Sequence, residues 1–202
     1  DNPLIFLKKN SSLKIERLIV ASTDTFFPID LTPQHNVALE NQSGMTIKGF
    51  SFIKDAVEKK YPPINQKPSR RLFFSRKGSQ WRRISNEAAA IEMLSKYGFE
   101  SLLIENYSFE EQVRIFQQAQ IIIAPNGSAT NNLIFSPPET KTLLLGQEGI
   151  YNWGTWFGSL KELGYEIEYL SGKTSSEGEG KHLDYQISID LLENKVKQLL
   201  SH

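Results

Sequence analysis

The sequence contains no cysteine among its 202 residues. Disulfides, thiolate zinc sites and a cysteine nucleophile are therefore excluded within it, and the composition suits a reducing compartment. The sequence also lacks any run of about 18 apolar residues, so it predicts no membrane-spanning helix. Its formal net charge is zero, and no overall field favours nucleic acid or an anionic membrane surface.

Metal and nucleotide motifs are also missing. The three histidines, His35, His182 and His202, are scattered without the spacing of metal ligands. No Asp-x-Asp pair offers carboxylates to a nucleotide-bound divalent ion. The absence of Gly-x-Gly-x-x-Gly and of a Walker loop argues against a dinucleotide enzyme and a P-loop NTPase. We therefore expect no cofactor and no metal site.

From residue 70 onward, strand-like and helix-like segments alternate. The pattern predicts strands at 71–75, 101–104, 120–124, 141–145 and 165–170, and helices at 85–97, 108–119, 156–163 and 188–200. Residues 171–181, rich in Gly, Ser and Glu, are expected to form a loop. The alternation predicts an α/β fold, with a Rossmann-like parallel sheet covered by helices on both faces.

Residues 1–65 have a different pattern. A buried strand is expected at 17–21, a long polar loop at 23–44 and a helix at 47–61, which Pro62 and Pro63 end. We therefore divide the chain into residues 1–65, a preceding lobe with its linker, and residues 66–202, the sheet-containing lobe.

Residues 121–132 are the most informative segment. A run of β-branched residues ends at Pro125, small and amide-bearing residues follow, and a helix-like apolar segment begins at Leu133. Gly127 permits a positive φ or a close backbone approach, and Asn126 or Ser128 is expected to cap the helix. Open amide groups at a helix start suit an anionic ligand. A plain capping loop explains the segment as well.

Residues 67–83 are basic, with no acidic residue among them. Arg70 and Arg71 fit a solvated positive face as well as a ligand site. Arg76 and Lys77 follow a predicted strand directly, at the edge where open α/β sheets bind ligands. Because a guanidinium grips phosphate oxygens through two donors, we favour Arg76 as a ligand contact.

The segment from Arg83 to Glu87 has two interpretations. Ser85 is expected to cap the following helix, with Glu87 favoured in its first turn by the helix dipole. Alternatively, Asn86 or Glu87 contacts a ligand in the same crevice.

Over residues 70–145 the chain resembles glycosyltransferase family 61, which includes plant xylosyltransferases, animal O-linked N-acetylglucosaminyltransferases and bacterial capsule-associated enzymes. The matching residues are Ser75-Arg76, Arg83, Asn86-Glu87, Leu94, Tyr97-Gly98-Phe99, Ser108-Phe109, Gln112, Ala119, Ala124-Pro125, Gly127-Ser128-Ala129, Asn131-Asn132-Leu133, Phe135 and Pro138.

The resemblance implies a GT-B-type lobe that binds a nucleotide-sugar donor, here the C-terminal lobe preceded by a remnant of the acceptor lobe. It also implies inverting, metal-independent transfer to a glycan acceptor. We expect Arg76, Lys77 or Arg83 and the amides of Gly127, Ser128 and Ala129 to hold the diphosphate of a UDP- or GDP-sugar. Asn86, Asn131 and Asn132 are expected to orient hydroxyl groups. No catalytic base is identified, and we expect it outside this chain.

Two positions depart from the family pattern. The family often has His-Gly where this chain has Asn126-Gly127, and asparagine does not titrate near neutrality. The family often has a glutamate after the strand at 141–145, where this chain has Leu145-Gly146, with Glu148 slightly beyond. The first departure motivates an alternative, a non-catalytic nucleotide- or glycan-binding module. A scaffold domain of a polysaccharide assembly complex is a further alternative.

The expected partners are a nucleotide sugar and a glycan, without nucleic acid. Capsule-associated relatives point to the bacterial cytoplasm at the membrane periphery, with a secretory-pathway lumen as the alternative.

Overall fold

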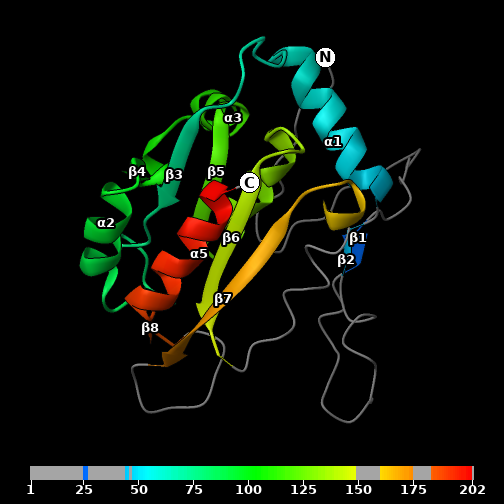
Figure 1. Cartoon of the computed structure of the whole chain (residues 1–202). Helices are drawn as coiled ribbons and strands as arrows, with labels where there is room; N and C mark the ends of the chain where they lie inside the picture. The colour runs from blue at the N-terminus through cyan, green and yellow to red at the C-terminus, as the bar shows by residue number, and fades with distance from the viewer. Residues whose placement is uncertain (1–24, 27–43, 46, 149–159, 175–182, 202) are drawn as a thin grey trace, which may run out of the picture.

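The computed structural model describes residues 25–26, 44–45, 47–148, 160–174 and 183–201 (Figure 1). In this part of the chain, one six-stranded sheet has the strand order β4-β3-β5-β6-β7-β8. Strands β1 (Thr25–Phe26) and β2 (Gly44–Met45) form a separate antiparallel pair.

The strands of the large sheet are β3 (Arg70–Phe74), β4 (Phe99–Leu102), β5 (Ala119–Pro125), β6 (Lys141–Gln147), β7 (Ile167–Thr174) and β8 (Tyr185–Gln186). The α-helices are α1 (Ile47–Lys60), α2 (Glu87–Ser95), α3 (Phe109–Gln117) and α5 (Ile189–Ser201), and the 3-10 helices are η3 (Ile104–Asn106) and η4 (Ser128–Phe135). Strands β3 to β7 pair in parallel, whereas β8 is antiparallel to β7. The α/β prediction is confirmed, with a mixed and mostly parallel sheet in place of a wholly parallel one.

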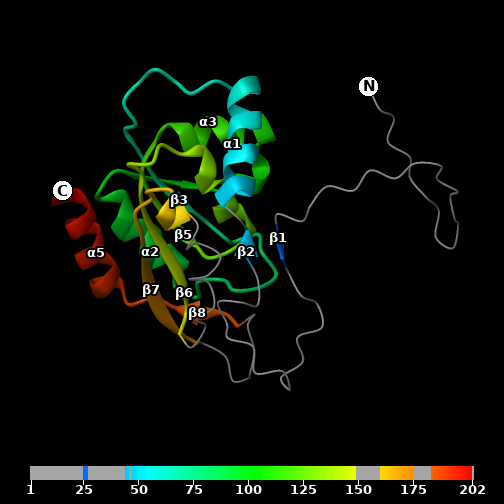
Figure 2. The same cartoon turned by 90° about the vertical axis from the view of Figure 1, so that its right-hand side faces the viewer.

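Helices cover both faces of the sheet, as the sequence predicts. Figure 2 shows α2 and α5 on one side of the sheet and α1 and α3 on the other. Alternate residues of the strands point to opposite faces, so Leu72 and Ile122 join the core under α1 and α3. Phe73 and Ile121 join the core under α2 and α5.

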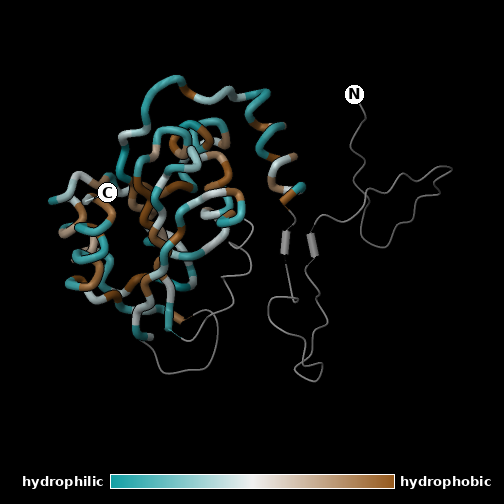
Figure 3. Tube along the Cα trace, turned by 45° about the vertical axis from the view of Figure 1, so that its right-hand side comes forward, coloured by the Kyte–Doolittle hydropathy of each residue, from teal (hydrophilic) through white to brown (hydrophobic). Residues whose placement is uncertain are grey.

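Strand β5 lies in the middle of the sheet. Its residues Ile121, Ile122, Ile123 and Ala124 are all at most 1% exposed. A strand covered on both faces needs apolar residues at consecutive positions instead of alternate ones, which explains the uninterrupted run. Figure 3 shows these hydrophobic segments at the centre and hydrophilic segments on the outer helix surfaces.

Most predicted element ends are close to the observed ones. The starts of α2 and α3 test the two N-cap predictions, Ser85 and Ser108. The Ser108 prediction is confirmed: its hydroxyl accepts from the Glu111 N–H, and the Glu111 carboxylate accepts from the Ser108 N–H. The Ser85 prediction is wrong, because Asn86 is the N-cap of α2 and makes no side-chain capping bond. The Ser85 hydroxyl instead donates to the carbonyl of Tyr185.

The C-terminal part of the sheet differs most from expectation. Strand β7 continues to Thr174, into the segment expected to be a loop, and β8 has no counterpart in the predicted elements. A Cβ atom at Gly172 would collide with the backbone of Gln186. Glycine therefore allows β8 to pack closely on β7, a long-range contact that local composition does not reveal.

Helix α1 confirms the expected helix at 47–61, and its Phe50 belongs to the same core as Leu72 of β3. The division of the chain at residue 65 stays a prediction. The expected strand at 17–21 and most of the expected helix at 156–163 lie outside the described residues.

Candidate functional site

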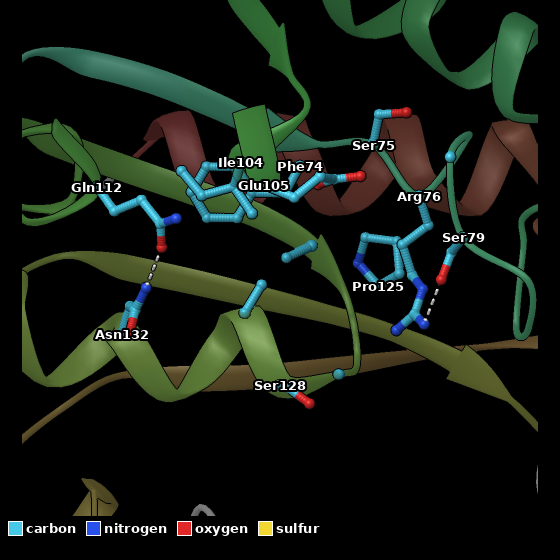
Figure 4. Close-up of a pocket in the computed structure, with 14 residues that line it drawn as sticks. Phe74, Ser75, Arg76, Ser79, Ile104, Glu105, Gln112, Pro125, Ser128 and Asn132 are labelled. Carbon is cyan, nitrogen blue, oxygen red and sulfur yellow. Dashed lines mark hydrogen bonds between the residues drawn. The ribbon is translucent and has the colours of Figure 1, made fainter. Parts of the chain in front are cut away.

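A cavity of about 550 Å³ opens at the carboxyl ends of β3 and β5 (Figure 4). The chain leaves β3 toward β4 on one side, whereas it leaves β5 toward β6 on the other. The strand order therefore reverses between β3 and β5, and open α/β sheets bind ligands at such a point. Arg76, two residues after β3, and Gly127, two residues after β5, both line the cavity.

Arg76 is the cation of the cavity, and its guanidinium is partly ordered by the protein. Its Nη1 donates to the carbonyl oxygen of Asn126 at 3.2 Å, and its Nη2 donates to the Ser79 hydroxyl at 2.8 Å. Its buried Nε has no hydrogen-bond partner among the described residues. Since a guanidinium carries five N–H donors, this side chain keeps donors for an anion.

The buried carboxylate of Glu87 fixes the backbone that carries Arg76. It accepts from the Arg76 N–H at 3.0 Å and from the Ser75 hydroxyl at 3.0 Å. The Ser75 oxygen in turn accepts from the Lys77 N–H at 3.1 Å. Glu87 therefore links the start of α2 to the end of β3 and fixes the position of the Arg76 backbone.

Gly127 brings the second strand end against the guanidinium. A Cβ atom at this position would collide with Nη1 of Arg76. The φ angle is 178°, an extended value, so the close approach of the guanidinium, and not a positive φ, is what favours glycine here. Helix η4 begins at Ser128, earlier than the Leu133 start that we expected, and Gly127 is its cap, without the side-chain cap expected from Asn126 or Ser128.

The first turn of η4 faces the same cavity. Its first hydrogen bond joins the Thr130 N–H to the Gly127 carbonyl at 3.0 Å. The N–H groups of Ser128 and Ala129 precede this bond and have no acceptor within the helix. Both residues line the cavity, and Ser128 directly follows Gly127, which approaches Arg76 closely. A helix start in this place offers amide donors to an anion.

Other lining residues were not predicted, apart from Asn132. Gln112 in α3 and Asn132 in η4 provide polar groups at the opposite end of the cavity, and Phe74 and Ile104 provide apolar surface. Glu105 in η3 lies beside the Arg76 loop, since its Oε1 is 3.3 Å from a Cβ atom placed on Gly78. Figure 4 shows Gln112 and Asn132 far from Arg76 and Ser79. The strand-end rule that selects Arg76 would also select Glu105, since Glu105 follows the neighbouring strand β4.

Comparison with known families decides which chemistry this arrangement belongs to. The family model described as Glycosyltransferase 61 matches residues 21–143, more than half of the chain. The chain belongs to glycosyltransferase family 61. No curated protein matches it.

The predicted site residues of this family member fall into two groups, those that line the cavity and those that do not. Those that line the cavity are Arg76, Gly127, Ser128, Ala129 and Asn132, whereas Lys77, Arg83, Asn86, Glu87, Asn126 and Asn131 are not among its lining residues. Lys77 is exposed beside the cavity, and Glu87 acts from behind it through the backbone of Arg76.

Arg83 and Asn86 have structural partners near β8 in this glycosyltransferase. Arg83 forms an exposed ion pair with Asp184 at 2.7 Å, and its hydrogen bond to Asp184 lowers the pKa of that carboxyl. The Asn86 amide exchanges two hydrogen bonds with the backbone of Ile187. Both side chains therefore hold the β3–α2 connection to the C-terminal part of the chain.

Arg82 adds positive charge near Arg76. Burial lowers the pKa of its guanidinium, and the charge of Arg76 lowers that pKa further. Arg82 also has a φ angle of 56°, a conformation uncommon for a residue with a side chain. Two neighbouring guanidinium groups repel each other, and an anion bound beside them relieves that repulsion.

The described segments contain no group of three His, Cys, Asp or Glu side chains placed to hold a metal ion. Their helices are all too short or too polar to cross a lipid bilayer.

Proposed function

We propose that this glycosyltransferase moves a hexose or pentose from a UDP- or GDP-sugar to a glycan acceptor, with inversion, in capsule or exopolysaccharide biosynthesis. In this proposal the described sheet is the C-terminal, donor-binding lobe of a GT-B-type enzyme. The observation that carries the proposal is the contact of the Arg76 guanidinium with the Gly127 turn at the strand-order reversal.

Departure of a nucleoside diphosphate builds negative charge on the leaving phosphate. Donors that are already in place stabilise such charge at low reorganisation cost. Arg76 has this property because Ser79 and the Asn126 carbonyl hold its guanidinium while donors stay available. The amides of Ser128 and Ala129 supply further fixed dipoles. Arg76 and these amides would stabilise the leaving group without a metal ion.

The acceptor side of the reaction requires a base near the attacking hydroxyl. Among the residues that line the cavity, Glu105 is the carboxylate. We assign no base. We expect this lobe to determine the binding of the donor.

The test is a transfer assay with UDP- and GDP-sugars on the full chain and on two arginine variants. Arg76→Ala should lower turnover at least tenfold, about 1.4 kcal/mol of transition-state stabilisation. Arg83→Ala is the matched control, because it removes an arginine of the same connection that pairs with Asp184 outside the cavity. Equal turnover in both variants would remove Arg76 from the phosphate role.

The alternative of a non-catalytic binding module is motivated by Asn126 in place of histidine. Asn126 is buried, its side chain is not among the groups that line the cavity, and its Oδ1 has no hydrogen-bond partner among the described residues. Release of UDP or GDP from a sugar nucleotide, dependent on Arg76, would exclude this alternative.

A further inference from the structure

A chain of hydrogen bonds leads from strand β8 to the guanidinium of Arg76. The Tyr185 hydroxyl donates to the Leu145 carbonyl at 3.1 Å. The same carbonyl accepts from the Asn126 N–H at 2.8 Å, and the Asn126 carbonyl in turn accepts from Nη1 of Arg76 at 3.2 Å. A side chain of β8 is therefore connected to the cation of the cavity through the ends of β6 and β5.

The backbone of Tyr185 binds the connection that carries Arg76. The Tyr185 N–H donates to the Arg83 carbonyl at 3.0 Å, and the Tyr185 carbonyl accepts from the Ser85 N–H at 2.8 Å. Both partners belong to the β3–α2 connection. One residue of β8 thus holds the two segments that form the site: the β3–α2 connection through its backbone, and the Gly127 turn through its hydroxyl.

The Tyr185 side chain is 1% exposed and is not among the groups that line the cavity. Burial raises the pKa of its hydroxyl, so the group stays protonated and remains a donor at neutral pH. The charges of Arg76 and Arg82 act on this pKa in the opposite direction, because both guanidinium groups lie near the ring. Tyr185 is therefore close to the cation but outside the reach of a ligand.

The Leu145 carbonyl has two donors, and this indicates what the hydroxyl contributes. Without the hydroxyl, the carbonyl would still accept from the Asn126 N–H, so no buried acceptor would lose its last donor. The second donor instead fixes the direction of the carbonyl, and bonds in such a chain strengthen one another. Loss of the hydroxyl should therefore loosen the contact between Asn126 and Arg76 more than it destabilises the fold.

We propose that Tyr185 is a positioning residue for the diphosphate site, holding the Arg76 guanidinium and the Gly127 turn in the arrangement that grips the two phosphates. The proposal rests on the proposed function, because it assumes that the diphosphate binds at Arg76. It makes donor binding depend on β8, although neither residue of β8 lines the cavity.

The experiment is titration calorimetry of the full chain with UDP, GDP and inorganic pyrophosphate. Tyr185→Phe removes only the hydroxyl and should weaken the binding of pyrophosphate about fivefold, the effect of one lost hydrogen bond. The affinity for UDP or GDP should fall by the same factor, because the change is confined to the phosphate end.

Tyr165→Phe is the matched control. Tyr165 is also buried, and its hydroxyl donates to the carbonyls of Ile134 and Ser136, which are not among the residues that line the cavity. This variant should keep its pyrophosphate affinity within about twofold, while urea unfolding shows a loss of stability at least as large as that of Tyr185→Phe. A purely structural role of Tyr185 would not separate the two variants in this way.

A double-mutant cycle tests whether the effect passes through Arg76. In an Arg76→Ala background, Tyr185→Phe should change pyrophosphate affinity by less than about twofold, since residues that act through each other are not additive. Gly172→Ala is a second route to the same result. Its Cβ would collide with the backbone of Gln186, the neighbour of Tyr185, and the displaced β8 should also weaken pyrophosphate binding.

Three results would overturn the proposal. Tyr185→Phe and Gly172→Ala could bind pyrophosphate as tightly as the unmodified protein, Tyr165→Phe could weaken binding as much as Tyr185→Phe, or the effect of Tyr185→Phe could persist in full in the Arg76→Ala background. In each case Arg76-dependent nucleotide binding would survive. If the unmodified protein binds neither nucleotides nor pyrophosphate, or if Arg76→Ala binds them equally well, the proposed function fails as well.

Discussion

At the scale of single residues, the site depends on how closely Gly127 approaches Arg76. The guanidinium occupies the space that any side chain at Gly127 would need. The sequence allowed this pairing to be predicted, because both residues directly follow strands of a parallel sheet. It did not allow the roles of Arg83 and Asn86 to be predicted, since their partners near β8 lie 101 positions away.

Gly127→Ala should displace the Arg76 guanidinium and lower nucleotide affinity at least tenfold, since the new Cβ would overlap Nη1. Gly146→Ala is a matched control, because a Cβ there meets nothing within 4 Å, and its affinity should stay within twofold of the unmodified protein. Titration of UDP and GDP into both variants is the measurement. Similar affinities for the two variants would contradict the close-approach argument.

At the scale of elements, the β3–α2 connection is built around a buried carboxylate. From the sequence we expected Glu87 to interact with the helix dipole or to contact a ligand. In the structure its carboxylate accepts hydrogen bonds from the Ser75 hydroxyl and the Arg76 N–H. A residue eleven positions from Arg76 acquires this role only when strand and helix pack together, so local pattern could not show it.

Glu87→Ala should lower the free energy of unfolding by about 3 kcal/mol, because the buried Ser75 hydroxyl and the part-buried Arg76 N–H lose a charged acceptor. Urea unfolding measures the change, and Glu92→Ala, an exposed substitution on the same helix, should change it by less than about 0.5 kcal/mol. A small effect of Glu87→Ala would mean that water or another group satisfies these donors.

The capping box of α3 predicts a pH dependence. Hydrogen bonds from the Ser108 side chain and backbone lower the pKa of the Glu111 carboxyl below its usual 4.5. Stabilisation from a lowered pKa is present at neutral pH and is lost as the pH falls through the folded-state pKa. Glu111→Gln should therefore unfold at lower urea concentration than the unmodified protein at neutral pH, and the difference should shrink as the pH falls below 4.5. A difference independent of pH would contradict this assignment.

At the scale of the whole molecule, helices cover both faces of the sheet, and the cavity opens where the strand order reverses. Alternating strands and helices made the layers predictable, because parallel strands need crossover helices. The short antiparallel β8 was not predictable, because long-range contacts position it. The Tyr185 hydroxyl donates a hydrogen bond to the Leu145 carbonyl, and its ring packs in the core under α5. The family match places this molecule among glycosyltransferases, and the sheet positions its candidate donor site.

The central claim is that Arg76 and the Gly127 turn together hold a diphosphate. Calorimetric titration of UDP and GDP into the full chain, Arg76→Ala and Arg83→Ala tests it most directly. We expect binding to the full chain, at least tenfold weaker binding to Arg76→Ala and an unchanged affinity in Arg83→Ala. Equal affinity of all three proteins, or no nucleotide binding to the full chain, would contradict the claim.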